Sequence, residues 1–297
     1  MRKSSDPLAL DSLMQDVLAS ARYRDISPDL IRRIAEQELA KRRNLKEALK
    51  TTKSKLHQVG GAYFAGQEQQ YAAWLAELQA VVQTEDKQRI QQVCRRLMEH
   101  HTSTGERLPI LDQFYSTILA DLAPIHSLLD IACGLNPLAI PWMPLAQGAH
   151  YYGYDIYQQM TAFLNEWLAI MKVQGHVQAR DVIQSCPGAA LKDDLPARGY
   201  PSGTPAGHPL WTDEVEVAFI LKTIPCLEQV DKQAGHRLLH SIRARHLVVS
   251  FPVHSLGGHS KGMAANYEAR FRELLGHTPW TVKKFAFSTE LVFVVSK

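Results

Sequence analysis

The stretch SLLDIACGLNPLAIPW, residues 127–142, decides the fold. Apolar residues run into Asp130, and a single glycine, Gly134, precedes an Asn-Pro pair and a second apolar segment. This order is typical of a buried strand that turns into a helix beside a nucleotide-sized ligand. A dinucleotide turn carries two or three glycines, because backbone amides must approach the pyrophosphate closely. Asn136 stands two positions after Gly134, and Pro137 has no amide to donate, so the turn argues against NAD.

S-adenosylmethionine suits this turn better, because it has no phosphate and one glycine leaves room for its amino-acid end. A helix starting at Pro137 would direct its positive end towards the cofactor's carboxylate. Asp155 ends a second predicted strand, where it can accept both ribose hydroxyls, and Asp181 ends a third, where it can accept from the adenine amine beside Val182. The alternative is that each strand-end acid simply caps the next helix.

Short apolar or β-branched runs alternate with helix-like segments after residue 125. The runs occupy 126–132, 150–156, 177–182, 215–221 and 245–251, and WTVKKFAFSTELVFVVSK (280–297) follows as two β-rich runs around a turn near Ser288. Such alternation predicts a parallel sheet with crossover helices, here closed by a terminal antiparallel hairpin. We therefore expect an α/β fold, a Rossmann-like class I methyltransferase domain with a mostly parallel seven-stranded sheet, over residues 106–297. Residues 185–213, rich in proline and glycine, are expected to form a long loop.

Residues 1–105 contain no strand pattern and are predicted to form an all-helical N-terminal domain. Ser27 and Pro28 begin one helix, a second carries Leu45 to Leu56 and stops at two glycines, a third contains Trp74, and a fourth follows Thr84 as its cap. The formal net charge of the chain is only +3, but this region holds 17 Lys and Arg against 13 Asp and Glu. Much of the excess lies in one block: Lys41, Arg42, Arg43, Lys46, Lys50, Lys53 and Lys55. Such a block is either a solvated helix face or a surface for a polyanion.

The four cysteines, Cys94, Cys133, Cys186 and Cys226, share no CxxC spacing, so we expect neither a metal site nor a disulfide framework. No run approaches membrane-spanning length, and the N-terminus lacks the apolar core of a signal peptide. These features favour a cytoplasmic protein that does not contact a membrane.

Four further segments make the motif set specific: KLHQVGGAY (55–63), HTSTGER (101–107), FILKTIPCLE (219–228) and SFPVHSLGGHSKGMAANY (250–267). Together with DIACGLNPLAI (130–140), they resemble the aminoglycoside-resistance 16S rRNA (guanine-N7) methyltransferases, which modify guanine 1405 in the decoding region of the small ribosomal subunit. The resemblance covers nearly the whole chain and departs mainly in the 185–213 loop. It implies S-adenosyl-L-methionine as cofactor and the 30S subunit as partner, and we expect a monomer.

The resemblance also implies site residues. The cofactor contacts fall on Tyr63, His101, Thr102, Ser103, Arg107, Ala132, Gly134, Asp155, Asp181, Val182 and Leu221. Lys222 and Glu228 are implied near the target base, and the basic block with His259 and Met263 is predicted to contact rRNA.

Several of these residues also have ordinary structural explanations. Ser103 and Glu106 have the spacing of a capping box, Tyr63 could be core packing, and Lys222 and Glu228 could form an ion pair with each other. Arg107 is basic in a first helical turn, where the helix dipole disfavours it, so it calls for a carboxylate partner such as the methionine end of the cofactor.

The residues after the fourth predicted strand are consistent with methylation at N7, because they lack a motif that methylation of an amine favours. Methylation of an exocyclic amine favours an Asn/Asp-Pro-Pro-aromatic tetrapeptide, whereas this chain has Leu221-Lys222-Thr223-Ile224. Guanine N7 is a lone-pair nucleophile with no proton to lose, so alignment of the reacting atoms can supply much of the rate. We hypothesise that Lys222 fixes the base through O6 and that Glu228 accepts from N1 and N2 or orients Lys222.

Three departures from the resemblance bear on the target. Gln229, His254 and His259 stand where basic residues are usual, and histidine is mostly neutral at pH 7, so contacts with the target should be weaker. The alternatives are a methyltransferase for a different decoding-region nucleotide, or a non-catalytic cofactor-binding protein associated with the ribosome. A small-molecule methyltransferase would explain the turn but not the basic helical domain.

Overall fold

The computed structural model describes residues 7–42, 44–61, 70–182, 214–253 and 263–297. Predictions that concern Tyr63, Arg43, His254, His259 and the 185–213 loop lie outside the described residues.

One seven-stranded sheet organises the described part of the chain, in the order β3-β2-β1-β4-β5-β7-β6. The strands are β1 (Ile125–Ile131), β2 (Leu145–Asp155), β3 (Gln174–Ala179), β4 (Val215–Leu221), β5 (Ala244–Pro252), β6 (Thr281–Ala286) and β7 (Glu290–Ser296). The first five are parallel, and β7 pairs antiparallel with both β5 and β6. The predicted Rossmann-like sheet with a terminal hairpin is confirmed.

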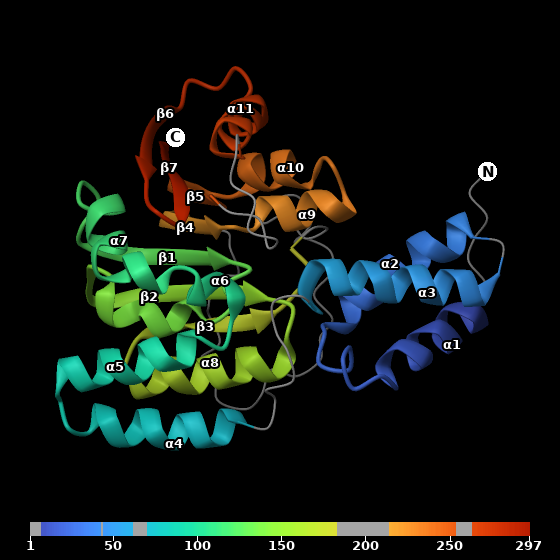
Figure 1. The fold of residues 1–297 in the computed structure, drawn as a ribbon, viewed down its shortest axis with the longest axis horizontal. Helices are drawn as coiled ribbons and strands as arrows, with labels where there is room; N and C mark the ends of the chain where they lie inside the picture. Colours follow the sequence, from blue (N-terminus) through green and yellow to red (C-terminus); the bar gives the residue numbers. More distant parts are fainter. Residues whose placement is uncertain (1–6, 43, 62–69, 183–213, 254–262) are drawn as a thin grey trace.

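The central strands are apolar on both faces, because helices cover both sides of the sheet. Along β1, Leu128 joins one hydrophobic cluster and Leu129 joins the other. The first cluster contains apolar residues of α7 (Leu111–Ile118), α8 (Gln158–Ile170) and the 3₁₀ helix η4 (Asn136–Trp142). The second contains those of α9 (Ile224–Val230), α10 (Ala234–Ser241) and α11 (Met263–Leu275). Figure 1 shows α9, α10 and α11 on the opposite side of the sheet from α8.

The N-terminal helices divide into two groups. Helices α1 (Pro7–Leu18), α2 (Pro28–Lys41) and α3 (Leu45–Leu56) pack on one another, and a π-helical turn, η1 (His57–Gly61), continues α3. We call these three helices the bundle. Helices α4 (Tyr71–Val82) and α5 (Lys87–Met98) instead contact α8 and η4, on one face of the sheet. The predicted helical unit 1–105 therefore includes two helices that pack with the sheet.

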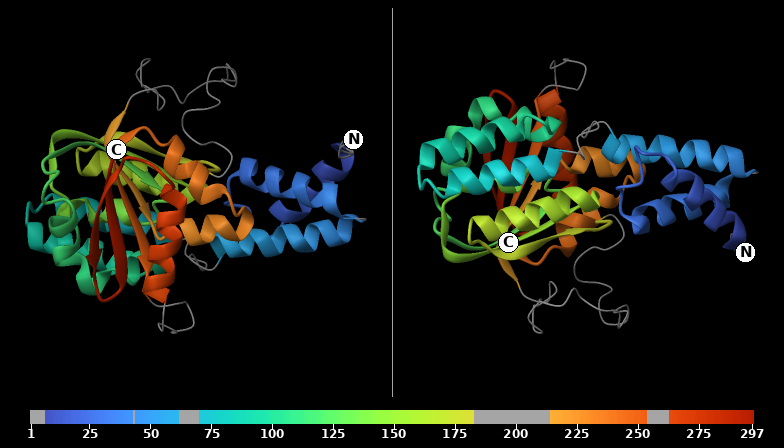
Figure 2. Two further views of the ribbon diagram at one scale, coloured as in Figure 1. Left: turned by 90° about the horizontal axis from the view of Figure 1, so that it is seen from above. Right: turned by 90° about the horizontal axis from the view of Figure 1, so that it is seen from below.

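The bundle lies beyond the carboxyl ends of the parallel strands. In Figure 1 the arrows of β1, β2 and β3 point towards α1, α2 and α3, and both views of Figure 2 place the bundle at that end. Ligands of open parallel sheets bind at this edge. The chain therefore places a mainly helical element over the edge where the sequence predicts the cofactor.

Three local predictions need correction. The third strand ends at Ala179, so Asp181 lies two residues beyond its end. The helix predicted after Gly134 is a 3₁₀ helix, and Pro141 lies inside it. The cap of α5 is Asp86, whose carboxylate accepts from the amides of Gln88 and Arg89, rather than Thr84.

Candidate functional site

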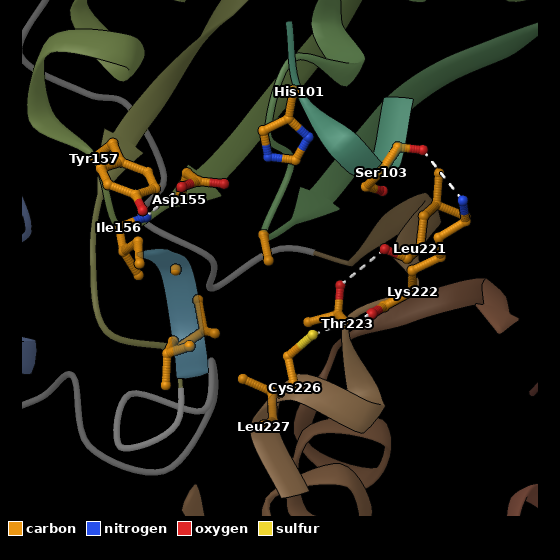
Figure 3. Close-up of a pocket in the computed structure, with 14 residues that line it drawn as sticks. His101, Ser103, Asp155, Ile156, Tyr157, Leu221, Lys222, Thr223, Cys226 and Leu227 are labelled. Atoms are coloured by element: carbon orange, nitrogen blue, oxygen red, sulfur yellow. Dashed lines mark hydrogen bonds between the residues drawn. The ribbon is translucent and has the colours of Figure 1, made fainter. Parts of the chain in front are cut away.

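A cavity opens at the carboxyl edge of the sheet, among β1, β2, β4, α9 and η1 (Figure 3). It encloses about 600 Å³ of empty space, part of which is open to solvent. Fourteen residues line it: Val59, Gly60, His101, Ser103, Ala132, Asp155, Ile156, Tyr157, Val182, Leu221, Lys222, Thr223, Cys226 and Leu227.

Asp155 holds the turn after β1. Its Oδ2 accepts from the backbone amide of Gly134 at 2.8 Å, and its Oδ1 accepts from the amide of Ile156 at 2.7 Å. Burial raises the pKa of Asp155, although these backbone hydrogen bonds act in the opposite direction. Each carboxylate oxygen retains acceptor capacity, since an ionised carboxylate offers about four lone-pair sites.

Both the backbone conformation at position 134 and the nearby side chain of His101 require a glycine there. Its φ is +51°, and a Cβ built on it would lie 2.6 Å from Cε1 of His101. The imidazole ring thus occupies the space that any other residue would fill. Burial, with the charges of Arg107 and Lys222, lowers the pKa of His101 to about 3, so the ring is neutral at pH 7.

The bundle supplies one wall of the cavity through η1. A Cβ on Gly60 would lie 2.5 Å from Cδ1 of Ile156 and 2.6 Å from the hydroxyl of Tyr157. A glycine at the end of η1 therefore lets this turn approach the residues that follow β2. The cavity thus combines the turn that follows the bundle with residues of the sheet domain.

Arg107 lies at the centre of a buried ionic network rather than in the cavity wall. Its Nε donates to Oε1 of Glu290 at 2.8 Å, and its Nη1 donates to Asn136 at 2.8 Å. Lys222 Nζ is 3.3 Å from the same Glu290 oxygen. Burial alone would raise the pKa of Glu290, but the charges of Arg107 and Lys222 lower it. The carboxylate partner that Arg107 requires is thus Glu290, on β7.

A second part of this network lies on β1. The Asp130 carboxylate accepts from Asn136 Nδ2 at 2.8 Å and from the hydroxyl of Tyr151, and Asn136 also accepts from Tyr115. Burial raises the pKa of Asp130 to about 6, against the lowering effect of these hydrogen bonds. Asp130 is 1% exposed and does not line the cavity. It therefore holds η4 against the sheet.

Lys222 connects the end of β4 to the segment that precedes Arg107. Its Nζ donates to the Ser103 carbonyl at 3.2 Å and to Glu106 Oε2 at 2.7 Å (Figure 3 shows the first of these). Its φ is +57°, in the left-handed region that favours glycine, and Ala132 has φ +54°. Strained backbone at non-glycine residues clusters at functional sites, where the surrounding structure enforces it.

Glu228 has a partner of its own. Arg270 on α11 donates to Oε1 of Glu228 at 2.6 Å. Lys222 pairs with Glu106 and Glu290, so the ion pair considered between Lys222 and Glu228 does not form. The Glu228 side chain is 15% exposed and lies outside the cavity wall.

Asp181 lies beside the cavity and pairs with Arg33 of α2. Both side chains are 5% exposed, and both carboxylate oxygens accept from this one guanidinium. Val182, the next residue, lines the cavity. The acid predicted to accept from adenine is thus bound by the bundle.

The basic block follows the end of α2 and the length of α3. Lys41, Lys46 and Lys50 are exposed and Lys53 is half-buried, and none of the four forms an ion pair with another residue that the structure describes. Arg42 and Lys55 both pair with Glu38 of α2. Lys41 at the end of α2 and Lys46 and Lys50 on α3 thus present exposed positive charge on the bundle.

Six of the predicted cofactor residues line the cavity, together with Lys222, which was predicted for catalysis; the six are His101, Ser103, Ala132, Asp155, Val182 and Leu221. Thr102 begins α6 (Thr102–Gly105) beside them. The capping box is wrong, because His101 is the N-cap of α6, no side chain caps it, and Glu106 binds Lys222 instead. Met263 begins α11, and nothing is described of its side chain.

Sequence reasoning missed Glu290 and seven residues of the wall, which are Val59, Gly60, Ile156, Tyr157, Thr223, Cys226 and Leu227. Five of the seven follow strands whose ends were predicted, so their positions along the chain were a usable signal. Glu290 offered a different signal, since it is an acid at the head of the apolar run LVFVV and is fully buried. Among the described residues, no group of three His, Cys, Asp or Glu could hold a metal ion. No helix in the same ranges could cross a membrane.

The residues of the cavity fit S-adenosylmethionine. Asp155 at the end of β2 can accept from ribose hydroxyls, and the apolar side chains of Val182, Ile156 and Leu227 can enclose the adenine. Gly134 and Gly60 let the wall residues His101, Ile156 and Tyr157 approach the backbone closely, where any Cβ would displace them. A neutral His101 imposes no positive charge beside a sulfonium. A Rossmann-like sheet of this strand order, with such a cavity at its carboxyl edge, is typical of S-adenosylmethionine-dependent methyltransferases. The chain belongs to this class of enzyme.

The comparisons with known proteins narrow this class. The model of the FmrO ribosomal RNA methyltransferases matches residues 19–196 and 206–294, and the chain belongs to this family. A 16S rRNA (guanine(1405)-N(7))-methyltransferase from Micromonospora rosea is 32% identical over 298 residues, which cover 100% of each chain. The enzyme of that name from Frankia casuarinae is 33% identical over 99% of this chain and 95% of its own.

Solved structures agree with the sequence comparison. The 16S rRNA methyltransferase RmtF in complex with S-adenosyl-L-homocysteine superposes with a TM-score of 0.77, at 27% identity, over 98% of this chain and 99% of that chain. The 16S rRNA methylase RmtB gives a TM-score of 0.72 at 26% identity, over 98% and 100%.

Proposed function

We propose that the chain methylates N7 of guanine 1405 of 16S rRNA in the 30S subunit and thereby gives aminoglycoside resistance. One observation carries the choice of N7: the described residues around the cavity offer no side chain suited to remove a proton. His101 has a pKa of about 3 and is too weak a base, and Asp155 is assigned to the backbone amides of the β1 turn and to the ribose hydroxyls of the cofactor. Lys222 donates to two carboxylates and a carbonyl.

Guanine N7 needs no base, because its lone pair is available on the ring. S-adenosylmethionine, when bound, supplies the methyl group on its sulfonium. The chain then needs only to hold the two reactants in line, which can contribute about 7 kcal/mol or more of the barrier reduction. The rigid network around Arg107 and Glu290 supports such positioning, because it fixes the ends of β4 and β7 together.

We assign Lys222 and Glu228 to the target side of the cavity. Lys222 Nζ is held by Ser103 and Glu106, so a contact with guanine O6 requires it to exchange one of these partners. Glu228 keeps two lone pairs beyond those that Arg270 uses, and these can accept from N1 and N2 of guanine. Lys222 precedes α9 and Glu228 lies within it, and Cys226 and Leu227 of the same helix line the cavity.

The bundle is proposed to dock on rRNA. Guanine N7 faces the deep major groove of an RNA helix, which side chains enter poorly, so the base must be turned out of its stack at a cost of a few kcal/mol. The exposed lysines of α2 and α3, Lys41, Lys46 and Lys50, can bind phosphates and offset this cost. Action on 30S subunits places the protein in the cytoplasm, and we propose that it acts as a monomer.

The test is incubation with 30S subunits and S-adenosylmethionine labelled on its methyl group. We expect label in 16S rRNA and reductive cleavage at the N7-methylguanosine at position 1405. Label at another decoding-region nucleotide would support the alternative that the exposed Gln229 and the two histidines 254 and 259 suggest. Tight association with 30S subunits without any label would indicate a non-catalytic cofactor-binding protein.

A further inference from the structure

The bundle is joined to the cofactor cavity by a continuous set of hydrogen bonds. The amide of Ser27 donates to the carbonyl of Ile156 at 2.7 Å, and the amide of Gln158 donates to the carbonyl of Asp25 at 2.9 Å. Ile26 forms an antiparallel bridge with Tyr157. The segment before α2 therefore pairs, strand to strand, with the residues that follow Asp155, and two of those residues line the cavity.

The same segment caps a helix of the sheet domain. Oδ1 of Asp25 accepts from the amide of Gln159 at 2.8 Å, in the first turn of α8. The N-cap residue of α8 itself is Tyr157, whose side chain makes no cap hydrogen bond. Asp25 is 6% exposed and supplies the missing acceptor from the bundle side. An acid at this place also complements the positive end of α8.

Arg33 completes the junction on the other side of the cavity. Its Nη2 donates to Oδ1 of Asp181 at 3.3 Å, and its Nε donates to Oδ2. A bidentate pair of this kind fixes the plane and direction of the carboxylate. Asp181 immediately precedes Val182, which lines the cavity. Thus the bundle holds both the wall after β2 and the wall after β3.

We propose that Arg33 is a positioning residue of the cofactor pocket, and that through it cofactor binding and docking of the bundle are energetically coupled. Arg33 orients Asp181 and keeps Val182 in the wall without lining the cavity itself. Because the same bundle is proposed to grip rRNA, any shift of α2 on docking acts on both cavity walls. The coupling must be reciprocal: S-adenosylhomocysteine and the 30S subunit change each other's affinity by the same factor. The ribosomal half of this inference rests on the proposed function, whereas the half about Arg33 does not.

The first experiment measures S-adenosylhomocysteine binding to the isolated full-length protein by calorimetry. We expect Arg33→Met to weaken binding at least tenfold. The matched control is Arg32→Met, which removes the same charge from the neighbouring, exposed position of α2. Asp181→Asn should also weaken binding, and the double variant should bind about as well as Arg33→Met, because the two residues act as one unit.

Loss of folding is separated from loss of positioning by circular dichroism and by a gentler variant. Arg33→Lys keeps the charge but cannot form both hydrogen bonds, so a folded protein with an intermediate affinity is expected. Binding by a folded Arg33→Met protein within twofold of the unchanged chain would overturn the proposal. Equal losses in Arg32→Met and Arg33→Met would also overturn it.

The second experiment measures 30S affinity with and without saturating S-adenosylhomocysteine. We expect the cofactor product to change the affinity of the unchanged chain by fivefold or more, and this factor to fall towards one in Arg33→Met. An equal factor in both proteins would refute the coupling. If neither protein binds 30S subunits, the proposed function fails instead, while the calorimetric result still decides the role of Arg33.

Discussion

Gly134 shows at the scale of one residue how the turn after β1 is built. Its positive φ disfavours any other residue, and the ring of His101 fills the space beside its Cα. The sequence alone indicated that one glycine suffices in this turn, but not which neighbour requires it. The reason is a histidine 33 positions earlier in the sequence, which no spacing rule connects with the turn.

Gly134→Ala should weaken S-adenosylhomocysteine binding at least tenfold. The new Cβ would displace His101 from the cavity wall, besides a backbone cost of roughly 1–2 kcal/mol. Gly148→Ala is the matched control, since Gly148 also has a positive φ, of +74°, but nothing lies within 4 Å of its Cβ position. Calorimetry on both proteins tests the idea, and equal affinities would contradict it.

Asp130 should make the stability of the protein depend on pH. Its pKa is about 6 in the folded chain and near 4 when unfolded, so the folded state binds more protons between these values. The free energy of unfolding should therefore fall as the pH rises from about 4 to 6, by about 3 kcal/mol from this residue. Urea titrations at several pH values measure the free energy of unfolding of the unchanged chain and of Asp130→Asn. Between pH 4 and 6 this free energy should fall in the unchanged chain relative to Asp130→Asn.

The variant Tyr151→Phe tests whether Asp130 is the group that makes stability depend on pH. The tyrosine hydroxyl donates to the carboxylate and lowers its pKa, so its removal should move the upper end of the pH-dependent range above 6. A range that stays in place, or one that persists in Asp130→Asn, would mean that another group titrates.

The turn between β4 and α9 links several elements through one side chain. Lys222 reaches from the end of β4 to Ser103 of α6, to Glu106, and to Glu290 at the head of β7. Sequence position suggested that Lys222 faces the target base, and the observed contacts add that it also holds the α6 segment in place. Both functions depend on a backbone conformation that lysine adopts rarely.

Lys222→Ala should lower the single-turnover rate of methyl transfer to 30S subunits by roughly 100-fold, since small misplacements of the reactants have effects of this size. Lys222→Arg should keep part of the rate, because it retains a cation for Glu290 and Glu106. Rates are compared at saturating cofactor, so that a change in cofactor affinity does not contribute. A weakened cofactor affinity with an unchanged single-turnover rate would show that Lys222 serves only the cofactor.

The elements were predictable where the sequence pattern is local. The run VEVAFIL was predicted as 215–221 and is β4 with those bounds, because a run that is apolar apart from Glu216 is typical of a parallel strand buried on both faces. β3 was predicted three residues too late, since its sequence QGHVQA is half polar at the edge of the sheet and carries a weaker pattern.

The contacts that organise the site were not predictable in this way. Arg107 and Glu290 are 183 positions apart, and Arg33 and Asp181 are 148 apart. Each charge was visible in the sequence, but its partner is determined by how the sheet brings distant elements together. The expected cofactor contact of Arg107 therefore gave way to a protein carboxylate, which no residue spacing indicated.

The whole molecule places its excess charge at one end. The bundle extends beyond the carboxyl edge of the sheet (Figures 1 and 2). Its exposed lysines include Lys41 at the end of α2 and Lys46 and Lys50 on α3. The cavity lies between the bundle and the sheet, next to η1. A polyanion that binds the bundle would thus be held close to the site where the methyl group is transferred.

Reversal of Lys41, Lys46 and Lys50 to glutamate should weaken 30S binding by at least 100-fold at moderate salt. Binding of phosphates releases counterions, so the slope of log affinity against log salt should also become shallower by roughly one unit for each lost phosphate contact. The affinity for S-adenosylhomocysteine should stay unchanged, because none of the three lysines lines the cavity.

The matched control reverses three exposed lysines elsewhere, Lys87, Lys232 and Lys283, and so changes the net charge by the same amount. Filter binding to 30S subunits across a salt series compares the two triple variants. If the bundle recognises rRNA, only the first variant loses 30S affinity and shows a shallower slope of log affinity against log salt. Local contacts, and not the total charge, then determine docking. Equal losses in both variants would mean that the long-range field of the protein attracts the ribosome, and the bundle would lose its proposed role.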